Sequence, residues 1–146
     1  MYSRESAQPS TILVLRFYPG SSTFRTDIIH RDAMGVEHLV HEHESSPERF
    51  GIDAFREAVR PSLAAGVRGA VIDLNEVRWA PSDVIATLLL VDTFLRDGDV
   101  SCVVANPNSR VMSVLTVTGM IWRLTVRDTM EEAIEYLTLE ADASSS

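Results

Sequence analysis

Two short apolar runs, each followed by a helical pattern, constrain the fold of this chain more than any other feature. The runs occupy residues 69–74 and 100–105, and turn residues bound both of them. A continuous apolar run of this length is typical of a strand buried on both faces, as in a parallel sheet. Strands that alternate with helices form βα units. The sequence therefore predicts an α/β fold. Its expected core residues are Val71, Ile72, Leu74, Val103 and Val104.

The remaining segments complete the expected architecture. Apolar and polar residues alternate on both sides of a turn at residues 32–35, which predicts a hairpin. Strands are expected at residues 11–17, 24–30, 36–43, 69–74, 100–105 and 124–126, and helices at 51–65, 82–96, 109–118 and from 128 onward. We expect four or five of these strands to form a mixed sheet, which about four helices cover.

Two of the expected helices begin with capping residues. Ser82 is the expected N-cap of the helix at 82–96, where its hydroxyl would accept a hydrogen bond from a free backbone N–H. Asp128 and Glu131 have the spacing of a capping box at the start of the last helix.

The length of 146 residues fits one domain, which we place at residues 11–140. Residues 1–10 and 141–146 are expected to be flexible tails. The longest apolar stretches are shorter than the ~18–20 residues needed to cross a bilayer. These features predict a soluble, cytoplasmic protein without membrane insertion.

The charge balance limits the classes of partner. Thirteen basic residues and 21 acidic residues give a net charge of 13 − 21 = −8. Binding to nucleic acid or to an anionic membrane depends on clustered basic side chains, so this balance disfavours both. Every basic residue is Arg, and the absence of Lys excludes Schiff-base and P-loop lysine chemistry. The single cysteine, Cys102, is expected to be a buried apolar side chain in a strand.

The second half of the chain resembles a known family. The resemblance is carried by residues 71–74 (Val-Ile-Asp-Leu), a loop with Val77 and Trp79, the helix opened by Ser82, residues 103–107 (Val-Val-Ala-Asn-Pro) and the pattern Val-Leu-x-x-Thr-Gly at 114–119. Over residues 66–137 the chain is similar to a STAS domain of the bacterial anti-sigma-factor antagonist type. This resemblance implies a STAS-like fold and a non-enzymatic role in the regulation of transcription.

The resemblance also implies a phosphorylation site. In the family the loop reads Asp-Ser-Ser-Gly-Leu-Gly, and its first Ser is phosphorylated by a partner kinase that is also the anti-sigma factor. That position corresponds to Ser82, where this chain reads Pro-Ser-Asp-Val-Ile-Ala. Pro81 replaces the Asp, Asp83 replaces the second Ser, and both glycines are lost. Ser82 is therefore either a phosphoacceptor or a purely structural residue.

The helix that starts at Ser82 is apolar on two sides. With ~100° between successive residues, one arc faces the expected sheet and contains Val84, Leu88, Val91 and Leu95. Another arc contains Ser82, Ala86, Leu89 and Thr93, with Ile85 beside it. A helix on a sheet normally has a polar outer face, so this second arc is either covered by another part of the chain or a docking surface. The expected partner-binding residues are Ser82, Asp83, Ile85, Ala86 and Leu89.

Three histidines lie among acidic residues at 38–43. On a strand, His41 and His43 would point to one face and His38 to the other, so only two could chelate a metal without a bend. The segment also lacks the His-Glu-x-x-His spacing of zinc hydrolases. We expect an exposed polar strand here, with no metal, no cofactor and no catalytic residues.

These features together predict a regulatory protein that binds an anti-sigma factor with serine-kinase activity or another protein partner. One alternative is a STAS scaffold or transporter-associated adaptor that is not phosphorylated. A second alternative is a metal-dependent enzyme that uses His38, His41 and His43. The sequence leaves the oligomeric state and the identity of the partner open.

Overall fold

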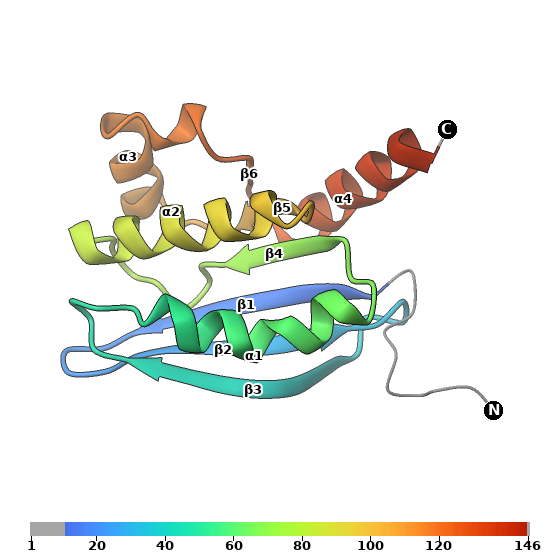
Figure 1. Ribbon diagram of the computed structural model, residues 1–146. Helices are drawn as coiled ribbons and strands as arrows, with labels where there is room; N and C mark the ends of the chain where they lie inside the picture. Colours follow the sequence, from blue (N-terminus) through green and yellow to red (C-terminus); the bar gives the residue numbers. More distant parts are fainter. Residues whose placement is uncertain (1–10, 146) are drawn as a thin grey trace.

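A six-stranded mixed sheet forms the centre of the protein. The computed structural model describes residues 11–145, with side chains as far as residue 143, so the expected tail at residues 1–10 lies outside the described residues. The strands are β1 (Ile12–Pro19), β2 (Phe24–Arg31), β3 (Glu37–Ser45), β4 (Gly69–Asp73), β5 (Ser101–Ala105) and β6 (Val126–Arg127). Their order across the sheet is β3-β2-β1-β4-β5-β6 (Figure 1).

The two halves of the sheet differ in strand direction. β1, β2 and β3 form an antiparallel meander, whereas β1, β4, β5 and β6 are parallel neighbours. This arrangement confirms the predicted mixed α/β fold. The sheet contains six strands rather than the expected four or five, because the edge strands β3 and β6, which correspond to the predicted strands at 36–43 and 124–126, both pair with it.

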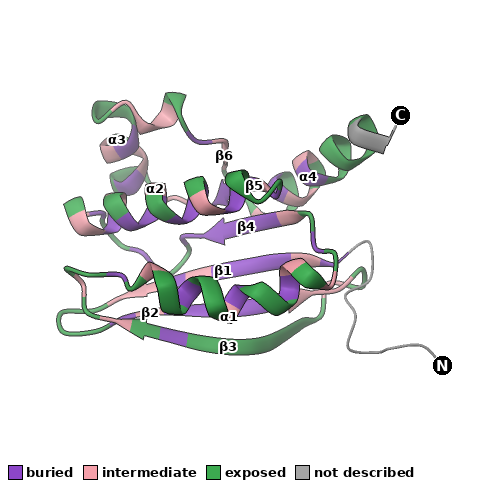
Figure 2. Cartoon of the chain, in the orientation of Figure 1, coloured by how far each residue is buried: buried purple, intermediate pink, exposed green. Residues whose placement is uncertain are grey.

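Helices cover both faces of the sheet. They are α1 (Ile52–Ala64), α2 (Ser82–Asp97), α3 (Ser109–Val117) and α4 (Met130–Ser145), with a short 3-10 helix η1 at Met120–Trp122. α1, α2 and α3 bury apolar side chains in a core on one face, and α4 packs on the other face against β4 and β5 (Figures 1 and 2). No helix among the described residues is both long enough and apolar enough to cross a membrane.

The two predicted apolar runs form the buried strands β4 and β5. Ile72 and Val104 face the core under α1, α2 and α3, whereas Val71 and Val103 pack under α4. Burial on both faces explains why these runs are apolar without alternation. All five predicted core residues are at most 1% exposed, and Cys102 is equally buried, which confirms these predictions. Burial raises the pKa of the Cys102 thiol.

The prediction that Ser82 caps α2 is wrong. Pro81 is the N-cap, and its carbonyl accepts a hydrogen bond from the N–H of Ile85 at 3.2 Å. The helix begins one residue earlier than a Ser82 cap would require, because Pro81 has the extended backbone that is typical of an N-cap. Ser82 is the first helical residue, and its side chain is exposed.

The capping box of α4 lies one residue further along the chain than predicted. Thr129 Oγ1 accepts a hydrogen bond from the N–H of Glu132 at 3.1 Å, and Glu132 Oε1 accepts one from the N–H of Asp128 at 3.2 Å. Thr129 with Glu132 therefore replaces the expected pair of Asp128 and Glu131, because both pairs have the same spacing and chemistry. α4 continues to Ser145, so the expected tail at 141–146 is helical as far as the structure describes it.

All five phenylalanines of the chain and His43 form one aromatic cluster. Neighbouring ring centroids are 5.3 Å apart for Phe17 and Phe24, 6.0 Å for Phe24 and Phe50, 5.1 Å for Phe50 and Phe55, and 6.1 Å for Phe55 and Phe94. The His43 ring lies 4.8 Å from Phe50 and 5.6 Å from Phe55. The cluster joins the meander to α1 and α2, and Phe55 is its centre.

Replacing Phe55 by Ala tests how much this cluster contributes to the stability of the fold. Because Phe55 is fully buried, we expect Phe55→Ala to lower the free energy of unfolding by about 3–5 kcal/mol. Val117→Ala, at an exposed position, is the control and should change it by less than about 0.5 kcal/mol. Urea unfolding followed by circular dichroism measures both. A loss below about 1 kcal/mol for Phe55→Ala would contradict the central role of the cluster.

Candidate docking surface

Asp73, the last residue of β4, fixes the edge of the sheet from which α2 begins. Its carboxylate accepts hydrogen bonds from Arg16 Nε at 2.6 Å, Asn106 Nδ2 at 2.9 Å and the N–H of Asn75 at 3.0 Å. Asp73 is buried, so these three donors compensate a charge that would otherwise be costly. They join the ends of β4 and β5, strand β1 and the loop that leads to α2.

Arg16 extends this network to the edge of the meander. Its guanidinium also donates two hydrogen bonds to the Glu37 carboxylate, both at 3.1 Å. Although burial alone would lower the pKa of Arg16, the hydrogen bonds and charges of Glu37 and Asp73 raise it above its ordinary value. The hydrogen bonds from Arg16 lower the pKa of Glu37. This network is not predictable from a local pattern of residues, because its members are far apart in the chain.

The loop between β4 and α2 has a fixed path. Asn108, the N-cap of α3, accepts a hydrogen bond from the N–H of Val111 and donates one from Nδ2 to the carbonyl of Arg78, both at 2.8 Å. Val77 and Ala80 are buried, whereas Trp79 between them is 62% exposed. The loop therefore presents a large apolar ring to solvent next to the start of α2.

The first turn of α2 places a free hydroxyl beside a carboxylate. Ser82 is exposed, and Asp83 is half-buried. Asp83 Oδ1 accepts a hydrogen bond from the N–H of Val84 at 3.0 Å, and the same N–H also donates to the carbonyl of Pro81 at 3.0 Å. The Asp83 carboxylate therefore lies at the positive end of the helix dipole. The first turn of α2 therefore contains one acidic group before any modification of Ser82.

The structure confirms the two expected arcs of α2. Val84, Leu88, Val91 and Leu95 are buried, whereas Ser82, Ala86 and Thr93 are exposed and Ile85 and Leu89 are half-buried. Leu90, which was not among the predicted partner-binding residues, is 42% exposed. We call Trp79, Ser82, Asp83, Ile85, Ala86, Leu89 and Leu90 the α2 surface. All the expected partner-binding residues belong to it, because they lie on one helix.

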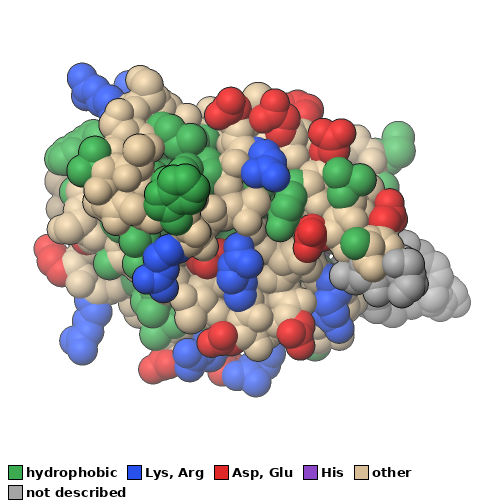
Figure 3. Space-filling model, turned by 90° about the horizontal axis from the view of Figure 1, so that it is seen from above, with side chains coloured by type: hydrophobic (Ala, Val, Ile, Leu, Met, Phe, Trp, Pro, Cys, Tyr) green, Lys and Arg blue, Asp and Glu red, His purple; other side chains and the backbone are tan. Residues whose placement is uncertain are grey.

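Further apolar side chains are exposed on α3 and η1. Val117 and Trp122 are 87% and 88% exposed. Figure 3 shows hydrophobic side chains gathered at the end of the molecule that carries α3. Large exposed apolar side chains of this kind are typical of interaction surfaces.

The predicted orientation of the histidines is wrong for His38. A bulge in β3 leaves Val40 without a partner between Leu39 and His41, which reverses the alternation of side chains. His38, His41 and His43 are opposite His30, Ile28 and Thr26 of β2, and opposite residues share a face. Ile28 faces the core under α1, so all four histidines lie on that face.

The shared face does not bring three imidazoles together. His43 is buried beside α1, whereas His38 is exposed near the hairpin turn, where its Nε2 is 3.2 Å from Asp32 Oδ2. Four residues lie between the two, so they are five steps apart along the strand, on the order of 15 Å at about 3.3 Å per residue. Among the residues that the structure describes, no group of three or more His, Cys, Asp or Glu side chains could hold a metal ion.

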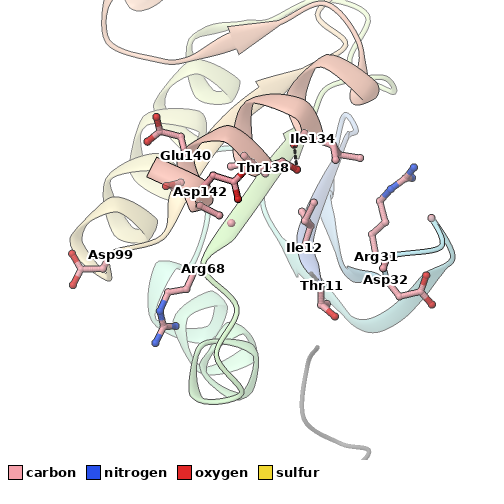
Figure 4. Close-up of a pocket in the computed structure, with 16 residues that line it drawn as sticks. Thr11, Ile12, Arg31, Asp32, Arg68, Asp99, Ile134, Thr138, Glu140 and Asp142 are labelled. Atoms are coloured by element: carbon pink, nitrogen blue, oxygen red, sulfur yellow. Dashed lines mark hydrogen bonds between the residues drawn. The ribbon is translucent and has the colours of Figure 1, made fainter. Parts of the chain in front are cut away.

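The two main cavities lie beside α4 and do not contain Ser82. A polar cavity of about 540 Å³ adjoins Arg16, Asp73 and Asn106. A larger cavity of about 890 Å³ lies at the opposite edge of the sheet, between α4 and the start of β1 (Figure 4). Ile12 and Ile134 contribute to its mainly apolar lining.

Comparison with known proteins identifies a shared fold. No family model matches the sequence, and no curated protein matches it significantly. The structure is similar to the crystal structure of a protein from Thermotoga maritima that is described as a candidate anti-sigma factor antagonist, with a TM-score of 0.50 and 21% sequence identity. The match covers 59% of this chain and 74% of that chain. The protein therefore has an anti-sigma-factor-antagonist-like fold, in agreement with the STAS-like resemblance of its sequence.

Proposed function

We propose that this chain is a regulatory binding protein that docks an anti-sigma factor with serine-kinase activity through the α2 surface. The observation that carries the proposal is the exposed Ser82 hydroxyl, which is not used as a helix cap and lies beside exposed apolar side chains. The similarity of the fold to an anti-sigma factor antagonist supports the proposal.

Phosphorylation of Ser82 would switch this docking through charge. A phosphate adds about 1.5 to 2 negative charges at neutral pH. The α2 surface has a single acidic side chain, Asp83, among mainly apolar side chains, so a partner that covers it buries mainly apolar area. A phosphate in that interface must lose its hydration without a matching charge, which disfavours binding.

Asp83 opposes this modification. The helix dipole favours an anion at the start of α2 by about 0.3–1 kcal/mol. A phosphate about 5 Å from the Asp83 carboxylate is repelled by about 1 kcal/mol per charge pair in water and by about 3 kcal/mol at an effective dielectric constant near 20. The repulsion equals or exceeds the help from the dipole, so Ser82 is a slow substrate unless the kinase supplies an Arg that pairs with both groups.

Replacement of Asp83 tests whether this residue slows the phosphorylation of Ser82. We expect Asp83→Ser to be phosphorylated faster than wild type by a cognate anti-sigma kinase at equal protein concentration, measured as phosphate incorporated per minute. Asp97→Ser, which removes the same charge at the far end of α2, is the matched control and should leave the rate unchanged. Equal rates for wild type and Asp83→Ser, or equal acceleration by both substitutions, would contradict the role of Asp83.

Introduction of a charge tests the docking site. We expect Leu89→Asp and Ala86→Asp each to weaken binding of the kinase by at least about tenfold, because the new carboxylate is buried in the interface without a partner. Isothermal titration calorimetry measures the affinity, and circular dichroism checks the fold. Leu139→Asp, on exposed α4, is the control. Normal binding by Ala86→Asp would exclude this surface, even if the half-buried Leu89→Asp failed to fold.

A docking protein that is never phosphorylated is the second candidate. The half-buried Asp83 favours it, because this residue places an acidic side chain beside Ser82. Such a protein would act as a scaffold or as a transporter-associated adaptor. Mass spectrometry after co-expression with anti-sigma kinases separates the two candidates, since only the first predicts a phosphate on Ser82.

A further inference from the structure

α1 is attached to the β2–β3 hairpin by one histidine near each of its ends. His43 Nε2 is 3.2 Å from the carbonyl of Gly51, the N-cap of α1. His30 Nε2 is 2.7 Å from Ser62 Oγ, in the last turn of α1. Both contacts are made by a side chain whose charge changes near neutral pH.

The environment of His43 suits a neutral imidazole. The residue is 4% exposed, and its ring lies against Phe50 and Phe55. The carbonyl of Gly51 can only accept, so Nε2 carries the proton in the neutral ring. Nδ1 is buried without a hydrogen-bond partner in the described structure, as is Thr26 Oγ1 on the facing residue of β2. Protonation would place an N–H and a positive charge at Nδ1, in a nearly dry site.

None of the groups that face the two histidines in the described part of the chain is acidic. His43 is flanked on β3 by His41, faces Thr26 of β2, and contacts the rings of Phe50 and Phe55 and the carbonyl of Gly51. His30 faces Leu13 of β1, Ser62 of α1 and His38 of β3. His38 is itself paired with Asp32. Protonation of His43 therefore places a positive charge beside the imidazole of His41, and protonation of His30 places one beside the imidazole of His38.

The acidic groups nearby are directed elsewhere. The charged side chains of α1 pair with each other on its exposed face, Arg56 with Asp53 at 3.2 Å and Arg60 with Glu57 at 2.5 Å. The carboxylates of β3 lie on the opposite face of the hairpin, because Glu37, Glu42 and Glu44 are opposite Arg31, Asp27 and Arg25. Neither set can neutralise His30 or His43 without rearrangement.

We propose that α1 and the β2–β3 hairpin form a proton-operated latch, which is closed while His30 and His43 are neutral and opens when they are protonated. α1 is the element that would move, because it buries three side chains, Phe55, Val59 and Ser62, whereas α2 buries six. Opening exposes the aromatic cluster around Phe55, which also contacts Phe94 of α2.

The direction of the pH effect follows from the two histidines. Burial, followed by the charge of His38, lowers the pKa of His30. Burial is also the largest effect on His43 and lowers its pKa, although the Gly51 carbonyl partly offsets it. The open state, with an ordinary pKa near 6.5, binds more protons than the closed state as pH falls below that value. The latch is therefore fully closed above about pH 6.5 and weakens as pH falls toward the lowered values.

Hydrogen exchange measured by mass spectrometry tests the latch in the full chain. Between about pH 7.5 and about pH 5, after correction for intrinsic exchange, we expect the protection of α1 amides to fall at least about tenfold relative to α2 amides. The double variant His30→Gln/His43→Phe should lose this pH dependence. His41→Gln, at the exposed neighbouring position, should keep most of it.

Three results would overturn the proposal. Parallel loss of protection in α1 and α2 would indicate general acid destabilisation, and unchanged pH dependence in the double variant would assign the effect to other groups. If the double variant fails to fold, NMR titration of the imidazole resonances in the wild-type protein measures the pKa values of His30 and His43 instead. A pKa at or above about 6.5 for both His30 and His43 would remove the basis of the latch.

Discussion

The buried carboxylate of Asp73 is the interaction on which the geometry of this molecule depends. It stands where β1, β4 and β5 meet the loop to α2, and Arg16, Asn106 and Asn75 hold it with three hydrogen bonds. Loss of one partner of a buried ion pair costs about 3–5 kcal/mol, because the other charge stays buried without compensation. The same bonds fix the loop that presents Trp79 and Ser82. The hydrogen bonds of Asp73 therefore contribute both to the stability of the sheet and to the position of the α2 surface.

The sheet face that carries α4 and the α2 surface differ in the polarity of their side chains. On the α4 face, α4 packs against β4, β5 and β6, and ion pairs lie on β1, β2 and β3. Those pairs are Arg16 with Glu37, Arg31 with Glu37, and Arg25 with Asp27. Exposed pairs contribute only about 0–1 kcal/mol each, but they place charged groups on this face of the sheet. The α2 surface has apolar side chains where a helix normally has polar ones. This contrast favours the α2 surface as the place where a partner binds.

Sequence patterns correctly predicted the elements whose positions depend on the burial of apolar residues. The apolar runs gave β4 and β5 with their core residues, and helical spacing gave the buried arc of α2. The predicted helix caps were wrong where either of two neighbouring residues could be the N-cap. Pro81 rather than Ser82 caps α2, and Thr129 rather than Asp128 caps α4. The predicted face of His38 was wrong for another reason. A one-residue bulge in β3 reverses the alternation of side chains, and the pattern of residue types does not reveal such a bulge.

The sequence by itself determined the α/β class, the buried strands and the exposed arc that begins at Ser82, because each depends on the spacing of apolar residues along one element. Only the tertiary structure decided which distant polar groups meet. Asp73 and Asn106 are 33 positions apart, and His30 and Ser62 are 32 apart, yet each pair is within hydrogen-bond distance. Such contacts depend on strand order, register and the bulge in β3. Those features follow from how whole elements pack together, which no local pattern of residues specifies.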